Sequence, residues 1–334
     1  MIDTTMAPAR QASTNLADDV RGPMVPRPVF LVGAVRSGTT LLRLMLDHHP
    51  ELAFDHEFEY AIDRLGPDGR HPDLAAYHAY LRRCRIFQDT GYEVDRDLDY
   101  PHLVDSFLRQ KQQRSGKGLV GATVHHDFGR VLEIWPDARF IHLVRDGRDV
   151  SLSIDAYGWT GTPYVATDWW LAAERAWDDL CRRVPRDRRV EIRFEDLIEH
   201  PEDALESICA FLDLDYADGM LSYPDDTTYA APSRRRVDRW RQVDPETLAL
   251  IEARMATMLA RRGYELSGLP LPAITPTEHR QFRRRARWAH ARKRLRDHGL
   301  VLFGLDALAR RLHAGPLQDW IRPHLHAVER ARLQ

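Results

Sequence analysis

A glycine-bounded loop near the N-terminus has the spacing of an anion-binding turn. Residues 33–40 read Gly-Ala-Val-Arg-Ser-Gly-Thr-Thr, which fits the pattern G-x-x-x-x-G. An apolar run ends at Gly33 and a helical pattern begins at Thr39, so the loop joins a predicted strand to a predicted helix. Glycines let backbone N–H groups converge on one centre, and a helix N-terminus adds partial positive charge. The loop is therefore predicted to hold a phosphate or a sulfate.

The loop departs from the nucleotide triphosphatase pattern at the position that usually carries lysine. In those enzymes a Lys follows the second glycine and reaches the β- and γ-phosphates, and the next Ser or Thr binds Mg²⁺. Here Thr39 takes the place of that Lys, and Arg36 supplies the positive charge. An arginine keeps its proton and donates in a planar fork, which suits it to clamping sulfonate or phosphate oxygens. We interpret the loop as a metal-free anion site.

A second candidate anion site follows another predicted strand. Residues 139–144 form a largely apolar run, Arg145 comes directly after it, and a helix is predicted from Gly147. Ser153 then lies about two turns into that helix. Because open α/β sheets bind ligands at the carboxyl ends of their strands, Arg145 and Ser153 are predicted to face such a crevice. The alternative is a surface knot of ion pairs on a helix cap, made by the charged residues among 145–149.

The elements that must position these residues alternate along the chain. Strands are predicted at 28–33, 139–144 and 190–194, and helices at 39–48, 147–154, 201–212 and 245–262. Residues 51–113 read as loosely helical. This order predicts an α/β protein of three layers, with a mainly parallel sheet flanked by helices. We expect a flexible N-terminal arm over 1–27, the main domain over 28–270, and a basic helical extension over 271–334.

Composition limits the kind of partner. The chain has 334 residues, 43% of them apolar, and a formal net charge of −2. This net charge argues against an overall electrostatic attraction of the protein to nucleic acid. Three cysteines without C-x-x-C spacing make a zinc site or a disulfide framework improbable and fit the cytoplasm. Residues 271–334 carry 14 Arg or Lys against 5 Asp or Glu. This extension is expected to pack on the body or on a second copy of the chain, or to bind an anionic membrane surface or polyanionic substrate.

Two motifs together resemble those of a known family. Residues 36–42 followed by His49-Pro50 resemble the 5′-phosphosulfate loop of sulfotransferases that use 3′-phosphoadenosine-5′-phosphosulfate (PAPS), especially the tyrosyl-protein branch and bacterial relatives. Residues 140–153 resemble that family's 3′-phosphate motif, and residues 194–197 match a further landmark of structural weight. The resemblance covers about 28–263. It implies a P-loop-like fold, PAPS as sulfuryl donor with 3′-phosphoadenosine-5′-phosphate (PAP) as product, and no metal.

The resemblance also implies roles for single residues in donor binding. The 5′ side of the donor would bind to Arg36, Ser37, Gly38, Thr39 and Thr40, and the 3′-phosphate to Arg145 and Ser153. Related enzymes place a late basic loop over the 3′-phosphate, which makes Ser233 and Arg235 candidates; a solvated charge run is the alternative.

A base that deprotonates the acceptor is implied as well. In the tyrosyl-protein branch it is a Glu that lies 21 residues after the loop arginine, and that position is Glu57 here. His56 and Glu59 are the alternatives for this role.

The lysine that usually stabilises the bridging oxygen has no counterpart here. The corresponding stretch, 121–127, contains His125 and His126 instead. A protonated imidazole of either residue is a candidate donor to that oxygen, and either is also a candidate base. They are otherwise structural, and a metal site with Asp127 is disfavoured because neighbours on an extended segment point apart.

These features favour transfer of a sulfuryl group to an acceptor, most simply a hydroxyl. The acceptor is left open among small molecules, lipids, glycans and peptides, with no nucleic acid expected. A P-loop nucleotide triphosphatase or small-molecule kinase is the alternative reading, and a catalytically inactive PAPS-binding protein is another.

Overall fold

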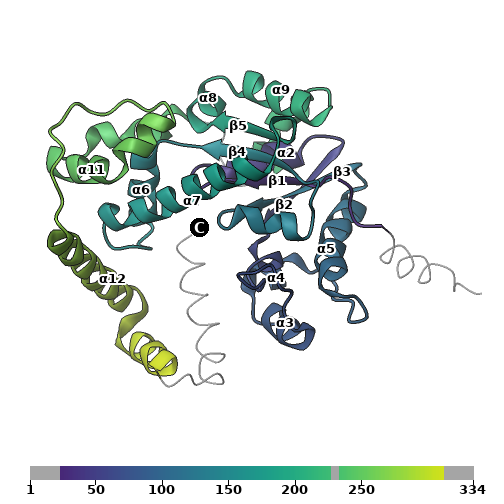
Figure 1. Ribbon diagram of the computed structural model, residues 1–334, viewed down its shortest axis with the longest axis horizontal. Helices are drawn as coiled ribbons and strands as arrows, with labels where there is room; N and C mark the ends of the chain where they lie inside the picture. The colour runs from purple at the N-terminus through teal and green to yellow at the C-terminus, as the bar shows by residue number, and fades with distance from the viewer. Residues whose placement is uncertain (1–22, 227–232, 312–334) are drawn as a thin grey trace, which may run out of the picture.

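Five parallel strands form the sheet on which the predicted site depends (Figure 1). In the computed structural model, which describes residues 23–226 and 233–311, their order is β2-β3-β1-β4-β5. The strands are β1 (Val29–Val32), β2 (Leu52–Glu57), β3 (Leu119–Val124), β4 (Arg139–Val144) and β5 (Arg189–Arg193). The central strand β1 is completely buried, with its alternate side chains in the two separate apolar cores on either side of the sheet. The predicted α/β fold with a mainly parallel sheet is confirmed.

Residues 51–113 differ from the expected loose helix at their start. This segment begins with β2, an edge strand that pairs with β3 alone. Helices follow only later, as α3 (Leu74–Leu81), α4 (Arg85–Thr90) and α5 (Tyr100–Ser115). The strand carries just three apolar residues before Asp55, His56 and Glu57, so its sequence resembles a polar turn more than a strand.

Helices cover both faces of the sheet. On one face lie α2 (Thr39–Asp47), α8 (Phe194–Glu199) and α9 (Pro201–Leu212), whose apolar side chains share a core with Val29 and Leu31. On the other face lie α5, α6 (Gly147–Ala156), α7 (Pro163–Arg183) and α11 (Pro245–Arg261), around Phe30 and Val32. Short helical segments join these elements: η1 (Glu59–Ala61), η2 (Phe128–Glu133), η3 (Arg186–Arg188), η4 (Asp218–Leu221), α10 (Tyr223–Asp226), η5 (Arg234–Arg236) and η6 (Arg239–Gln242).

The basic extension begins as a helix that leaves the body of the protein (Figure 1). Helix α12 (Pro276–Arg311) bends at Gly299 and docks its first half on the loop after α6. His290 Nδ1 lies 2.9 Å from the carbonyl oxygen of Gly158, and Lys293 donates to that of Ala156. No helix among residues 23–226 and 233–311 is long and apolar enough to cross a membrane.

The limits of the domain remain predictions. Val25 is buried, and its backbone N–H donates to the Asp105 carboxylate, so the chain is attached to the body shortly before β1. The rest of the expected arm, 1–22, and the end of the extension, 312–334, lie outside the described residues.

Candidate active site

The loop between β1 and α2 is closely packed against the start of α8. Arg36 and Gly38 both have positive φ, 71° and 100°. A Cβ atom at Gly38 would lie 2.4 Å from the Phe194 ring, so both the backbone conformation and the space require glycine there. Phe194 begins the segment 194–197, and this contact gives that segment a structural role in supporting the loop.

The loop presents the groups that an anion site needs. Ser37 is fully buried, and its hydroxyl has no hydrogen-bond partner among the described residues. Thr39 is buried at the first turn of α2, and Thr40 beside it is exposed. Buried polar atoms are nearly always hydrogen-bonded in folded proteins, so the Ser37 hydroxyl is available to a partner that the described residues do not supply.

The second predicted anion site lies directly beside the first. Arg145 leaves the end of β4 and donates through Nη1 to the carbonyl oxygen of Arg36, 3.0 Å away. Arg36 in turn donates through Nε to the Ser153 hydroxyl at 3.2 Å, and its guanidinium lies over the Tyr157 ring. The Arg145 Nε is buried and has no partner among the described residues. The two predicted anion motifs thus form one continuous site.

The charged residues at 145–149 are not a surface knot. Arg148 is only 2% exposed; it pairs with Asp146 and with Glu252, which lies on α11. Asp149 is also buried and accepts a hydrogen bond from the backbone N–H of Trp240. The surface alternative is therefore wrong: this segment is a buried ion-pair network that fixes the start of α6.

The late basic loop reaches the same place through its backbone. Arg145 donates through Nη2 to the carbonyl oxygen of Arg236, and Trp240 packs under the guanidinium of Arg148. Ser233 is half-buried and Arg235 is exposed. Neither side chain is hydrogen-bonded to the anion motifs among the described residues, so their donor-binding roles stay predictions.

His125 and His126 point to different surroundings, although they are neighbours. The imidazole of His125 is buried, with Nδ1 2.7 Å from Glu59 Oε1 and Nε2 3.0 Å from Thr39 Oγ1. The side chain of His126 is 53% exposed and lies 3.5 Å from carboxylate oxygens of Asp63 and Asp127. Of the two, only His125 contacts the anion loop.

Two acidic residues border this histidine. Glu57, the last residue of β2, is exposed and lies opposite Thr123 of β3, after an irregularity in the pairing of the two strands. Glu59 is buried, and its Oε1 also accepts a hydrogen bond from the backbone N–H of His125. The link between Glu59 and His125 joins residues 66 positions apart, and no spacing in the sequence predicts it.

Burial and pairing act in opposite directions on this pair. Burial alone raises the pKa of Glu59, but the hydrogen bond and charge of His125 outweigh it and hold that pKa below its usual value. Burial alone lowers the pKa of His125, but Glu59, with a smaller effect of Glu57, holds it above its usual value. Each member of the pair therefore favours the charged form of the other.

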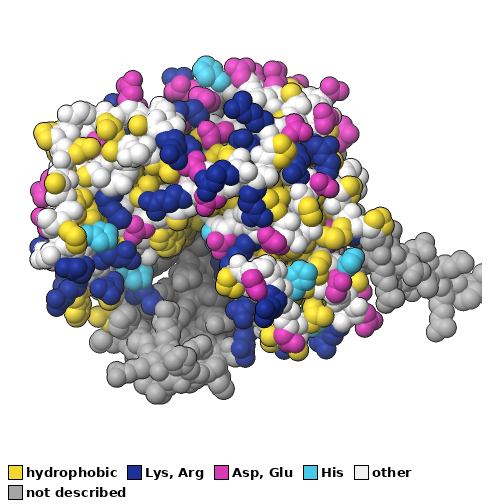
Figure 2. All heavy atoms as spheres, in the orientation of Figure 1, with side chains coloured by type: hydrophobic (Ala, Val, Ile, Leu, Met, Phe, Trp, Pro, Cys, Tyr) yellow, Lys and Arg dark blue, Asp and Glu magenta, His cyan; other side chains and the backbone are white. Residues whose placement is uncertain are grey.

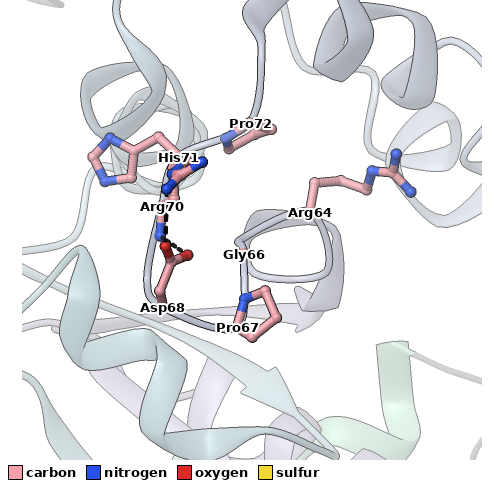
Figure 3. Close-up of a pocket in the computed structure, with 7 residues that line it drawn as sticks. All are labelled: Arg64, Gly66, Pro67, Asp68, Arg70, His71 and Pro72. Carbon is pink, nitrogen blue, oxygen red and sulfur yellow. Dashed lines mark hydrogen bonds and ion pairs between the residues drawn. The ribbon is translucent and has the colours of Figure 1, made fainter.

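Figure 3 shows a pocket that none of the predicted site residues lines. One short segment between η1 and α3 lines it, with Arg64, Gly66, Pro67, Asp68, Arg70, His71 and Pro72. Asp68 and Arg70 pair with each other across its rim, and no predicted site residue reaches it. Among residues 23–226 and 233–311, no cluster of His, Cys, Asp and Glu is arranged as a metal site.

Comparison with known proteins identifies the family. The sulfotransferase family matches residues 28–218, which is more than half of the chain and includes both anion motifs, Glu57 and His125. The chain belongs to the sulfotransferase family. The match ends before the late basic loop and α12, so those parts are features of this sulfotransferase outside the family match.

Individual relatives are distant. Protein-tyrosine sulfotransferase 2 of Gallus gallus is 25% identical over 289 residues, which cover 75% of each chain. The protein-tyrosine sulfotransferase of Drosophila melanogaster is 24% identical over 221 residues. That match covers 59% of this chain but only 40% of that enzyme's length. The omega-hydroxy-beta-dihydromenaquinone-9 sulfotransferase Stf3 of Mycobacterium bovis is 24% identical over 77% of this chain and 78% of its own.

Solved structures agree on the fold. The sulfotransferase domain of the curacin biosynthetic pathway covers 73% of this chain and 100% of its own, with 18% identity and a TM-score of 0.51. The sulfotransferase domain of the Synechococcus PCC 7002 olefin synthase covers 73% of this chain and 97% of its own, with 22% identity and a TM-score of 0.50. The predicted family and its P-loop-like fold are confirmed.

Proposed function

We propose that this sulfotransferase uses PAPS as its donor and transfers the sulfuryl group to a hydroxyl acceptor. The observation that carries the proposal is the contact between the two anion motifs, in which Arg36 reaches Ser153 and Arg145 reaches the backbone of Arg36. A donor with phosphate groups at both ends of one adenosine needs two adjacent cationic sites. The unpartnered buried atoms of Ser37 and Arg145, one in each motif, support such a ligand.

Each group has a distinct part in donor binding. The loop residues Arg36, Ser37, Gly38, Thr39 and Thr40 would hold the 5′-phosphosulfate at the N-terminus of α2. Arg145 and Ser153 would hold the 3′-phosphate, with Ser233 and Arg235 closing over it. No metal is required in this arrangement, because arginine and backbone N–H groups supply the positive charge.

In the transfer step, the acceptor oxygen forms a bond to sulfur as the bond between sulfur and the bridging phosphate oxygen breaks. Glu57 takes the acceptor's proton, and the electron pair of the broken bond stays on PAP. The charge that develops on the departing phosphate is stabilised by Arg36 and by the N-terminus of α2. Positioning and charge stabilisation therefore provide most of the catalysis.

The product nucleotide tests this donor directly. At about 100 times its dissociation constant, PAP is expected to stabilise the folded protein by about 2.7 kcal/mol, measured as a thermal shift. ATP with Mg²⁺ is expected to give no comparable shift, since Thr39 replaces the lysine that would hold the γ-phosphate. Stabilisation by ATP with Mg²⁺ but not by PAP would favour the kinase or triphosphatase reading. Transfer of ³⁵S from labelled PAPS then separates an enzyme from an inactive binding protein.

An aromatic strip supports an acceptor with an apolar or aromatic body. Tyr157, under the Arg36 guanidinium, is followed by Trp159 and Trp169 with ring centroids 5.6 and 5.9 Å apart. All three side chains are more than 40% exposed. Flat, exposed rings that start at the loop offer a surface for such an acceptor. The curated relatives include enzymes named for protein tyrosine, which has an aromatic ring, and for an omega-hydroxy menaquinone, which has an apolar body.

The first half of α12 supports contact with an anionic membrane surface. Residues 280–296 contain nine Arg or Lys and no Asp or Glu. Figure 2 shows Lys and Arg side chains gathered where α12 lies in Figure 1. Trp288 is 68% exposed, with Arg284 and Arg292 one turn away on either side. Exposed arginine around an indole fits the headgroup region of a membrane.

Vesicle binding tests this surface. The full-length protein is expected to sediment with vesicles that contain phosphatidylglycerol, to remain free of pure phosphatidylcholine vesicles, and to be released by salt. Replacing Arg284, Arg285 and Arg292 by Gln should abolish binding, whereas the same change at the exposed Arg182, Arg183 and Arg186 should not. Loss of self-association in place of loss of vesicle binding would instead make α12 a contact between copies.

The three cysteines are free thiols, which supports the predicted cytoplasmic location.

A further inference from the structure

Three side chains from different parts of the chain form a continuous hydrogen-bonded row into the anion loop. Glu59 lies on η1, His125 directly follows β3, and Thr39 begins α2. Glu59 Oε1 lies 2.7 Å from His125 Nδ1, and His125 Nε2 lies 3.0 Å from Thr39 Oγ1. The second hydrogen bond from the His125 backbone to Oε1 fixes the carboxylate relative to the ring.

The proton positions in this row follow from the donors and acceptors. An ionised carboxylate only accepts, so His125 Nδ1 carries a proton toward Glu59. In the imidazolium form Nε2 also carries a proton and donates it to Thr39 Oγ1. The hydroxyl proton of Thr39 is then directed away from His125. It is left to donate to an anion in the loop.

We infer that Glu59 is a positioning residue that keeps His125 as an imidazolium, which through Thr39 gives the loop a hydrogen-bond donor at the place where other P-loops have a lysine. The inference rests on the proposed function, because it assumes that the 5′ end of the donor occupies the loop. It also separates two roles that the sequence leaves open. A histidine held as an imidazolium cannot accept the acceptor's proton, so His125 is not the base and Glu57 stays the proposed one.

The surroundings of the ring favour its protonated form. The charged groups that face His125 are Glu59 from η1 and Glu57 from β2, and both favour the protonated ring. Thr39, from α2, is neutral. A buried carboxylate without a cation would be costly, so loss of the imidazolium proton destabilises both members of the pair.

The dependence of PAP affinity on pH tests the inference without an identified acceptor. Because the pKa of His125 is raised, the imidazolium persists to a higher pH than in a free histidine and is lost as the pH rises through that raised value. PAP affinity should fall over the same pH range, and this fall is the alkaline limb of its pH profile. In Glu59→Gln the amide still accepts from Nδ1 but carries no charge, so the limb should move to lower pH. At a pH between the two midpoints, affinity should be about tenfold weaker than in the unsubstituted protein.

Lysine at position 125 separates charge from shape. His125→Lys should bind PAP and keep its affinity at pH values where the unsubstituted protein loses it, and adding Glu59→Gln should then leave the limb unmoved. His125→Asn should bind weakly at every pH. The matched control is His102→Asn, which breaks an exposed histidine–carboxylate pair with Asp99 and should leave the limb in place.

The outcomes distinguish this inference from the proposed function. If the unsubstituted protein does not bind PAP, the proposed donor is wrong. If it binds PAP, but Glu59→Gln lowers only the melting temperature and leaves the limb unmoved, Glu59 is structural and the inference is overturned. Titration of the His125 ring by NMR, assigned with His125→Asn, gives a second reading in the unsubstituted protein. A midpoint at or below that of a free histidine would also overturn it.

Discussion

Replacing Arg36 by alanine is expected to lower kcat by about 10²–10³-fold, the effect of losing one donor to a transition state. Arg36 is the only basic residue among loop residues 33–40, and its guanidinium lies between the Ser153 hydroxyl and the Tyr157 ring. Arg36→Lys should recover only part of the loss, because an ammonium group does not reproduce the planar fork. The measurement is ³⁵S transfer from labelled PAPS to an acceptor that the unsubstituted protein uses.

The control for this change is an arginine outside the site. Arg182 on α7 is exposed and pairs with Asp179, so Arg182→Ala should leave kcat and PAP affinity unchanged. Normal turnover by Arg36→Ala would contradict the role of Arg36 as the loop's transition-state donor. A loss confined to PAP affinity, with kcat preserved, would restrict Arg36 to ground-state binding.

The sequence predicts those strands whose own residues show the apolar pattern of a strand. β1 and β4 are apolar runs buried on both faces, as expected for inner strands of a parallel sheet. β3 is also an inner strand, but Gly121 interrupts its apolar residues. A Cβ atom there would lie 2.5 Å from the Phe54 ring on β2, so the residue that weakens the pattern is required by a neighbouring strand. Such a requirement is tertiary and cannot be predicted locally.

The site shows the same division between local and distant signals. The anion loop could be predicted because its glycines, arginine and flanking elements lie within one short segment. The buried state of Arg148 could not, because its partner Glu252 lies 104 residues away. The partner of His125 is likewise distant. The sequence alone therefore offers Glu59 only as an alternative base close to Glu57, whereas the fold places its carboxylate against His125.

Replacing Glu57 by glutamine is expected to lower kcat by about 10²–10⁴-fold, the usual contribution of a positioned base. Glu57 is at the carboxyl end of β2, where the irregular pairing with β3 turns the chain, and irregular pairing of this kind often re-aims a side chain beside an active site. PAP affinity should not change, because the proposed role of Glu57 concerns the acceptor. The control is Glu51→Gln at the exposed residue just before the same strand, which should leave kcat unchanged.

The pH profile makes this prediction specific. Glu57→Gln should lower kcat at every pH at which the unsubstituted protein is active. The alkaline limb assigned to His125 should persist in that variant, since Glu57 makes the smaller contribution to its raised pKa. If Glu57→Gln keeps a normal kcat, the base is another group. The first to test would then be His56, whose ring is held by Asp55 at 2.8 Å on the same strand.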